Sequence, residues 1–184
     1  ILNNGGFVTL NRVLLLGNTG RQGGAISNSG VMTITNSVIQ GNSATPSGGG
    51  AGIAGAIVQS GSAHIYVENS TFTSNVTAFA DRSVIKISSG TSGEFVNVTI
   101  ANNTNKGIES GGTVTLTNSI LVGNSSANCV GTPISGGYNI VADSSCSITA
   151  TGDVTNTNPL LDTFIDNGDY TSHFKPLVDR KSVV

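Results

Sequence analysis

The carboxylates are the side chains of this chain best suited to chemistry, and two of them occupy related positions. Between residues 1 and 124 the only acids are Glu68, Asp81, Glu94 and Glu109. Glu68 and Glu94 stand one and three places before the same position of two successive repeats, which predicts that both point outward on one side. Hydrolysis of a glycosidic bond uses such a pair as acid and base. Because no Arg or His column accompanies them, we interpret both as solvated outward residues.

A second group of acids lies near the C-terminus. Asp162, Asp166 and Asp169 surround an Asn-Gly pair, and calcium sites bring several such oxygens together on a turn. Their spacing matches no EF-hand loop, so the three residues are only a weak Ca²⁺ candidate. We favour a turn in which Asp and Asn side chains accept hydrogen bonds from backbone amides.

The two histidines add little catalytic potential. His64 precedes a predicted strand and has no acid or nucleophile at a suggestive spacing. His173 lies near Asp166, Asp169 and Asp179, and with Asp166 it could complete an acid/base or metal set. We favour a surface role for His64 and a structural role for His173, and we expect no cofactor.

Cys129 and Cys146 are the only cysteines, and they enclose a Gly-rich segment. Such a pair can form a disulfide, belong to a metal site or remain as two free thiols. Since neither histidine is near them in sequence and no second cysteine pair exists, we favour the disulfide. Disulfides are typical of proteins outside the cytoplasm, so this pairing favours an extracellular or cell-surface location.

Many short strands are predicted to position these residues. Only 10% of the 184 residues are charged, Gly numbers 25 and Trp is absent, while Asn, Ser and Thr are abundant. This mixture suits strands joined by tight turns. The formal net charge of −2 and the scattered Lys and Arg argue against nucleic-acid binding. No apolar run is long enough to span a membrane.

One motif, clearest at residues 114–124, occurs five times. Each copy ends at an Asn, and the copies follow one another at steps of 24, 33, 28 and 21 residues. The final residues are Asn18, Asn42, Asn75, Asn103 and Asn124. A period in this range indicates a solenoid in which each repeat forms one coil.

Each copy also contains an earlier reference position, which is Asn in every copy except the first. An apolar residue stands at a fixed distance on each side of this position. The residues two places before it are Leu10, Ile34, Val67, Phe95 and Leu116. Those three places after it are Leu15, Ile39, Phe72, Ile100 and Leu121. More polar residues alternate with both columns, as in strands with one buried face. We therefore predict an all-β fold, a single-stranded right-handed parallel β-helix.

The repeated Asn residues are predicted to stack into ladders at two corners. The first ladder contains Asn36, Asn69, Asn97 and Asn118, with Arg12 in place of Asn in the first copy. The second contains Asn42, Asn75, Asn103 and Asn124. Asn tolerates the left-handed backbone conformation, and its amide can hydrogen-bond along a stack. We therefore expect both columns to turn corners and to have structural roles.

One domain is expected, with coils over residues 1–142 and an irregular capping segment over residues 143–184. The longest repeat contains a Gly-rich insertion at 45–55, which we predict to be a flexible outward loop. Because Ile1 begins in mid-pattern without Met, we expect a piece of a longer chain that packs against neighbouring domains.

Several of these strings resemble those of known bacterial surface proteins. The Gly-Gly-Ala-Ile box at residues 23–26 and the Asn-Ser-x-Ile-x-x-Asn strings are similar to chlamydial polymorphic outer-membrane protein repeats. The strings around Cys129, Tyr138, Cys146, Pro159 and Gly168 resemble the end of choice-of-anchor Q or CSLREA-type β-helix proteins. After Gly168 the chain departs from that pattern. The resemblance implies an exported, adhesin-like or structural module without assigned chemistry.

Outward positions of the second strand of each repeat form a candidate contact face. This face contains Leu14, Leu16, Val38, Thr71, Thr73, Thr99, Ile120 and Val122. Apolar side chains that point away from a core need cover or mark a contact surface. We predict that the C-terminal segment or a partner packs there.

The sequence therefore favours a non-catalytic, exported, adhesin-like or structural surface module whose ligand is a glycan or another surface protein. The alternative is a carbohydrate-active β-helix enzyme of the polysaccharide lyase or hydrolase kind. A second alternative is an ice-binding protein, which would use outward threonines such as Thr33, Thr35, Thr115 and Thr117. Tyr66 and Glu68 interrupt that array, which disfavours ice binding.

Overall fold

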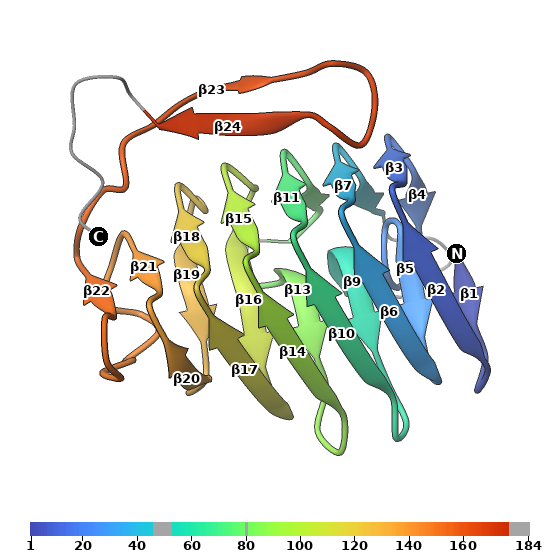
Figure 1. The fold of residues 1–184 in the computed structure, drawn as a ribbon. Helices are drawn as coiled ribbons and strands as arrows, with labels where there is room; N and C mark the ends of the chain where they lie inside the picture. The colour runs from blue at the N-terminus through green and yellow to red at the C-terminus, as the bar shows by residue number, and fades with distance from the viewer. Residues whose placement is uncertain (46–52, 80, 177–184) are drawn as a thin grey trace.

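The computed structural model describes residues 1–45, 53–79 and 81–176. Within these ranges every regular element is a β-strand, and the strands form parallel sheets and one antiparallel hairpin (Figure 1). The all-β prediction is therefore confirmed. The described residues contain no apolar helix of membrane-spanning length.

Three large parallel sheets contain most of the strands. Sheet A contains β1 (Leu2–Asn3), β5 (Ile26–Asn28), β9 (Ala54–Gln59), β13 (Ser83–Ile87), β16 (Lys106–Ser110) and β19 (Ala127–Val130). Sheet B contains β2 (Phe7–Asn11), β6 (Val31–Thr35), β10 (His64–Glu68), β14 (Ser92–Val96), β17 (Thr113–Thr117) and β20 (Ile134–Gly137). Sheet C contains β3 (Leu14–Leu16), β7 (Val38–Gln40), β11 (Thr71–Thr73), β15 (Thr99–Ala101), β18 (Ile120–Val122), β21 (Ile140–Val141) and β22 (Val154–Thr155).

Two smaller sheets complete the fold. Sheet D contains β4 (Thr19–Gly20), β8 (Ser43–Ala44) and β12 (Val76–Thr77), which pair in parallel. The C-terminal hairpin contains β23 (Leu161–Ile165) and β24 (His173–Pro176), which pair antiparallel.

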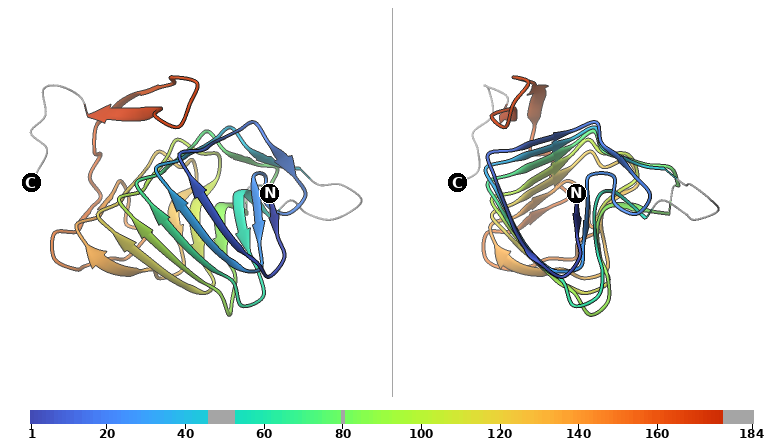
Figure 2. Two further views of the ribbon diagram at one scale, coloured as in Figure 1. Left: turned by 45° about the vertical axis from the view of Figure 1, so that its right-hand side comes forward. Right: turned by 90° about the vertical axis from the view of Figure 1, so that its right-hand side faces the viewer.

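Each sequence repeat contributes one strand to sheet A, then one to sheet B and one to sheet C. Consecutive strands of the chain thus lie in different sheets, while the strands at equivalent positions of neighbouring repeats pair side by side. Figure 2 shows the successive repeats stacked one behind another. This arrangement fits a parallel β-helix.

The core lies between the three sheets and consists of columns of stacked side chains. In sheet B the register aligns Leu10, Ile34, Val67, Phe95 and Leu116, and in sheet C it aligns Leu15, Ile39, Phe72, Ile100 and Leu121. All are fully buried except Leu10 and Leu15 of the first repeat, which are partly exposed. The predicted core columns are therefore confirmed. Sheet A adds a third column of Ile26, Ile57, Ile85, Ile108 and Cys129.

The first Asn ladder runs along the corner between sheets B and C as predicted. Arg12, Asn36, Asn69, Asn97 and Asn118 all have positive φ, between 48° and 56°. Each amide from Asn36 onward donates to the preceding repeat: Asn97 Nδ2, for example, donates to Asn69 Oδ1 at 3.0 Å. The ladder is exposed, so its main contribution is to the shape of the corner.

The second ladder differs from the prediction in one respect. Asn42, Asn75 and Asn103 hydrogen-bond along the stack, but the left-handed residue is the one before each, such as Gly41 (φ 61°) or Ser74 (φ 56°). This turn directs the Asn side chains inward, where they are buried. The corner therefore uses two residues per repeat, one for the turn and one for the bonds.

A third amide ladder stands at the corner between sheets A and B. Asn3 Nδ2 donates to Asn28 Oδ1 at 2.8 Å, and Asn28 Nδ2 donates to Gln59 Oε1 at 2.9 Å. All three side chains are buried. The repeated motif does not include these positions, so we did not predict this ladder.

The parallel pairing continues beyond residue 142, where we expected the coils to end. β22 pairs in parallel with β21, and Asp153 Oδ1 accepts hydrogen bonds from the backbone and side-chain nitrogens of Asn139, both at 3.0 Å. Asp153 thus continues the column of side chains at this corner, in which Ser119 N donates to Asn139 Oδ1 one repeat earlier.

The predicted disulfide is present and lies at this end of the core. Cys129 and Cys146 are bonded, with Cα atoms 4.8 Å apart, and both are buried. The bond attaches β19 to the segment that follows β21. It thus fixes the last strand of sheet A at the C-terminal end of the core.

Close packing explains the Gly-Gly pair before β5. A Cβ on Gly23 would lie 1.9 Å from the carbonyl oxygen of Ile26, and one on Gly24 would lie 2.0 Å from that of Gly55. No side chain fits at either position. Most of the insertion at 45–55, predicted as an outward loop, lies outside the described residues.

Candidate functional site

The outward side of sheet B, which we call the Tyr66 face, contains side chains that are all at least partly exposed. Its side chains alternate with the core residues along β2, β6, β10, β14 and β17, and none of them is buried. The register aligns them into columns that run across the strands. The central column contains Thr9, Thr33, Tyr66, Glu94 and Thr115.

Tyr66 stands in the middle of this face with a carboxylate on two sides. Glu94 is its direct cross-strand partner on β14, and Glu68 follows two places along β10. Partial burial raises the pKa of Tyr66, and the negative charges of Glu68 and Glu94 raise it further. Both glutamates are thus close enough to act on the phenol, although our reading of the sequence treated them as isolated.

His64 and Ser92 extend the polar part of this face. They are cross-strand partners on β10 and β14, and His64 Nδ1 lies 2.8 Å from Ser92 Oγ. The expectation that His64 is a plain surface residue missed this contact. The sequence alone could not pair Ser92 with His64, because this pairing depends on the register between β10 and β14.

Threonines flank the Tyr66 group on both sides. Thr33 and Thr35 lie on β6, and Thr115 and Thr117 lie on β17, separated by the residues of β10 and β14. The threonine array is therefore in two parts, with carboxylates between them. The centre of the face consequently offers one aromatic ring, two carboxylates and several hydroxyl groups.

Sheet C differs from sheet B because the C-terminal hairpin lies over its outward side (Figures 1 and 2). Gln40 Nε2 on β7 donates to Asp166 Oδ2 at the turn of the hairpin, at 3.2 Å. Of the candidate contact face, Val38 and Thr73 are buried, Leu16 is exposed, and Leu14, Thr71, Thr99, Ile120 and Val122 are partly exposed. The C-terminal hairpin thus lies beside this face, where one hydrogen bond joins it to β7.

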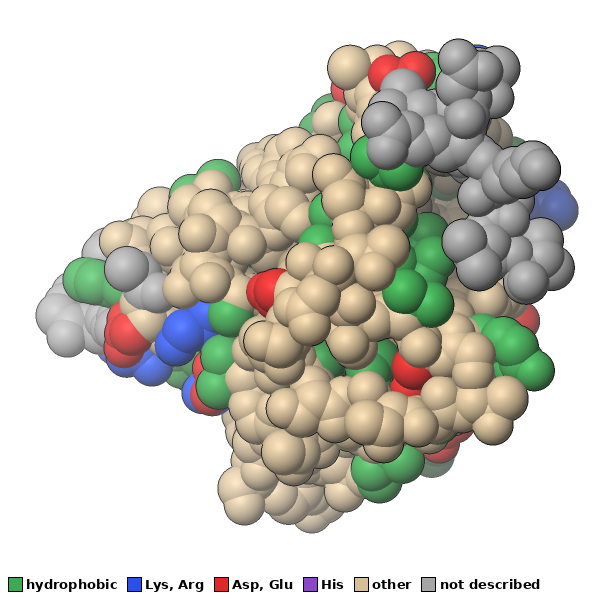
Figure 3. All heavy atoms as spheres, turned by 90° about the vertical axis from the view of Figure 1, so that its left-hand side faces the viewer, with side chains coloured by type: hydrophobic (Ala, Val, Ile, Leu, Met, Phe, Trp, Pro, Cys, Tyr) green, Lys and Arg blue, Asp and Glu red, His purple; other side chains and the backbone are tan. Residues whose placement is uncertain are grey.

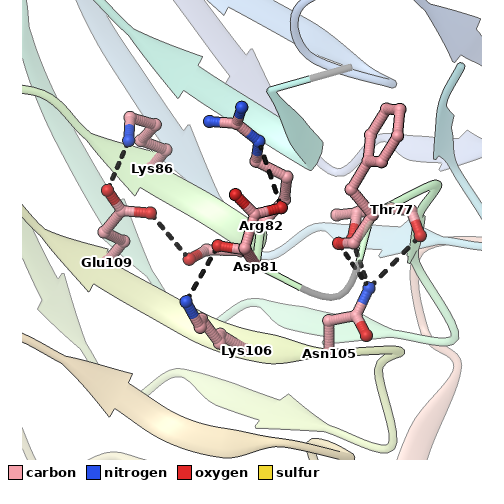
Figure 4. Close-up of polar contacts among 9 residues, drawn as sticks. Thr77, Asp81, Arg82, Lys86, Asn105, Lys106 and Glu109 are labelled. Carbon is pink, nitrogen blue, oxygen red and sulfur yellow. Dashed lines mark hydrogen bonds and ion pairs between the residues drawn. The ribbon is translucent and has the colours of Figure 1, made fainter. Parts of the chain in front are cut away.

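The charged side chains on the outer side of sheet A pair with one another (Figure 4). Glu109 accepts hydrogen bonds from Lys86 Nζ and, at 3.0 Å, from Ser83 Oγ. Lys106 Nζ donates to the backbone oxygen of Asp81 at 2.8 Å, and Arg82 Nε lies 3.6 Å from the Asp81 carboxylate. These contacts join neighbouring strands and the turn before β13. These contacts favour a structural role for the cluster, although Lys106 donates to a backbone oxygen and not to a carboxylate.

The three C-terminal aspartates mainly bind groups of their own hairpin. Asp166 Oδ1 accepts from the Gly168 amide at 2.8 Å, and Asp169 Oδ1 accepts from the Thr171 amide at 2.7 Å. These backbone bonds, with the Gln40 and Thr171 side chains, lower the pKa values of Asp166 and Asp169. Asp162 contacts only Thr163. Among the described residues no group of three or more potential ligands is arranged to hold a metal ion.

His173 is exposed on β24, and its Nδ1 lies 2.8 Å from the backbone oxygen of Thr171. Asp179, which we considered as its partner, lies outside the described residues. Viewed from the β22 end, the surface is mostly polar side chains and backbone, with charged groups in small patches (Figure 3).

Comparisons with family models, characterised proteins and solved structures found no match to this chain.

Proposed function

We propose that this chain is an exported, non-catalytic, adhesin-like surface module that binds glycans on the Tyr66 face. The fold we propose for it is the single-stranded right-handed parallel β-helix. The observation that carries the proposal is the position of Tyr66, between two carboxylates and two groups of threonines on an uncovered sheet face.

The chemistry of this group suits a sugar. A tyrosine ring offers an apolar surface with a polar tip, against which the C–H groups of a sugar ring can pack. The carboxylates of Glu68 and Glu94 accept hydrogen bonds, and the threonine hydroxyls both donate and accept them. Because these groups project from paired strands, the scaffold holds them in place before a ligand arrives.

The disulfide supports export, since its formation is compatible with an oxidising compartment. The resemblance of the repeats to bacterial surface β-helix proteins favours the same location. A protein partner on the bacterial surface is the other ligand class that fits a non-catalytic module.

A carbohydrate-active enzyme is the second candidate, and Glu68 and Glu94 are the observation that favours it. They lie on adjacent strands and each is a neighbour of Tyr66, so that a sugar bound over the ring would meet both carboxylates. Glycoside hydrolysis requires one protonated and one ionised carboxyl group. A binding module requires only that both accept hydrogen bonds.

A glycan array and a reducing-sugar assay on the same preparation distinguish these functions. The module predicts binding without turnover, and Tyr66→Ala should weaken binding by about tenfold, as expected for loss of an aromatic anchor worth about 1.4 kcal/mol. Tyr170→Ala on the hairpin is the matched control and should bind normally. Turnover that Glu68→Gln or Glu94→Gln abolishes would establish the enzyme instead. Absence of binding to any glycan would refute the glycan proposal.

A further inference from the structure

We infer that the ligand of the Tyr66 face is a linear polysaccharide with free amino groups, which lies across the strands along the stack of repeats. This inference rests on the proposed function and adds the chemical class and direction of the ligand. Two independent features of the face, its geometry and its charge, support it.

The central column has the geometry of a track for a linear polymer. Thr9, Thr33, Tyr66, Glu94 and Thr115 are consecutive cross-strand partners, so they follow one another across five parallel strands. Parallel strands lie about 4.8 Å apart, a spacing close to the length of one sugar ring in an extended chain. Successive sugars can therefore meet equivalent positions of successive repeats.

Both ends of the track are accessible within the described structure. The outward side chains at its two ends, Thr9 on β2 and Ile134 on β20, are exposed, and Ile134 pairs with Thr115 of the central column. The column is thus exposed at both of its described ends.

The charge of the face selects among polysaccharides. Its outward side chains include Glu68 and Glu94 but neither Lys nor Arg, from β2 through β20. Lys86 and Lys106 lie on sheet A, and Lys86 is paired with Glu109. A polymer of uronic acids would bring like charges to the two glutamates, whereas an ammonium group beside Tyr66 could pair with either of them. The ring can also contribute a cation–π contact.

Calorimetric titration with three sets of oligosaccharides of equal length tests this inference. Glucosamine oligomers, N-acetylglucosamine oligomers and galacturonic acid oligomers provide positive, neutral and negative chains on comparable sugars. At about pH 6 the glucosamine oligomers should bind about tenfold more tightly than the acetylated ones. Their affinity should rise from dimer to pentamer and fall with added salt.

Charge variants connect the preference to the face. Replacing both residues, Glu68→Gln with Glu94→Gln, should remove most of the preference for glucosamine while binding of the acetylated oligomers persists. Asp162→Asn removes one charge from the hairpin and should leave the preference unchanged.

The outcomes separate this inference from the function on which it rests. Equal or tighter binding of acetylated or galacturonic acid oligomers would overturn the amino-sugar assignment and leave glycan binding in place. An affinity that does not increase with length would overturn the track. If none of the three sets and no glycan on an array binds, both proposals fail.

Discussion

The side-chain oxygen of Asn75 accepts two hydrogen bonds from Asn42, one from the backbone nitrogen at 3.0 Å and one from the side-chain nitrogen at 2.9 Å. Its own amide donates to the Ile39 carbonyl at 2.9 Å and to Asn103 at 3.0 Å. Both Asn42 and Asn75 are fully buried. One side chain therefore satisfies buried polar groups of the repeats on both sides of its own.

Replacing Asn75 by Ala should lower the free energy of unfolding by about 2–4 kcal/mol, because it leaves buried donors and acceptors unpaired. Urea unfolding monitored by circular dichroism measures this change. Asn69→Gly in the exposed ladder is the control: it removes the Asn97 and Asn36 contacts but keeps the positive φ, so stability should change by less than about 1 kcal/mol. Equal losses for the two variants would contradict the distinction between the ladders.

Asp153 should make the last coil sensitive to acid. Partial burial tends to raise the pKa of Asp153, but hydrogen bonds from Ser135, Asn139 and Ala150 outweigh it, so its pKa lies below the usual value. A lowered pKa in the folded state stabilises the protein above the unfolded-state value of about 3.9. This stabilisation is lost as the pH falls through the folded-state pKa.

Asp153→Asn should therefore reduce stability at pH 7 by about 1.5–3 kcal/mol, the range for hydrogen bonds to a charged group. The variant should also lose less stability than the parent between about pH 5 and pH 2. Urea midpoints measured across this range test both effects. Identical pH profiles for variant and parent would show that Asp153 does not contribute through its charge.

The hairpin should detach from sheet C when its aromatic contact is removed. The rings of Phe164 and Phe174 lie with centroids 5.0 Å apart and are the cross-strand pair of β23 and β24. Phe174→Ala should lower the stability of the hairpin by about 1–3 kcal/mol. Cleavage of residues 156–176 by a protease should therefore become faster.

Lys175→Ala, an exposed change on the same strand, provides the matched control and should leave cleavage unchanged. If Phe174→Ala resists the protease as well as the control does, the aromatic pair does not hold the hairpin.

The disulfide should stabilise the C-terminal end of the core. Cys129 and Cys146 are 17 residues apart, and closing a loop of this size contributes about 3 kcal/mol on the chain-entropy estimate. Replacing both residues by Ala should lower the urea midpoint accordingly. Because both sulfur atoms are buried, a reductant should act on the parent only in the presence of denaturant. Reduction of the native protein at the rate of an exposed disulfide would contradict this burial.

Alternation and repetition in the sequence were sufficient to predict the strands of sheets B and C and their two core columns. Leu116 stands between two threonines, and an apolar residue recurs at the same place in the other copies, so local periodicity identifies the buried face of this strand. The left-handed residues of the first corner could be predicted as well, because Asn tolerates this conformation better than most residues.

Other features depend on contacts between residues distant in the chain. The sequence does not reveal that Asn75 points inward, since Ser74 rather than Asn75 adopts the left-handed conformation. Nor does it reveal the ladder of Asn3, Asn28 and Gln59, whose members stand at unequal spacings. Pairing across repeats decides these positions, because each buried amide must find a partner in the next coil.

The candidate site likewise combines local and tertiary information. The sequence by itself determined that Tyr66, Glu68 and Glu94 point away from the core, because strand alternation is a local property. Only the tertiary structure decided that Glu94 lies opposite Tyr66 and that the hairpin covers sheet C and leaves sheet B open. The insertions make the repeats unequal in length, so cross-strand register follows from packing of the stacked core and not from a count of residues.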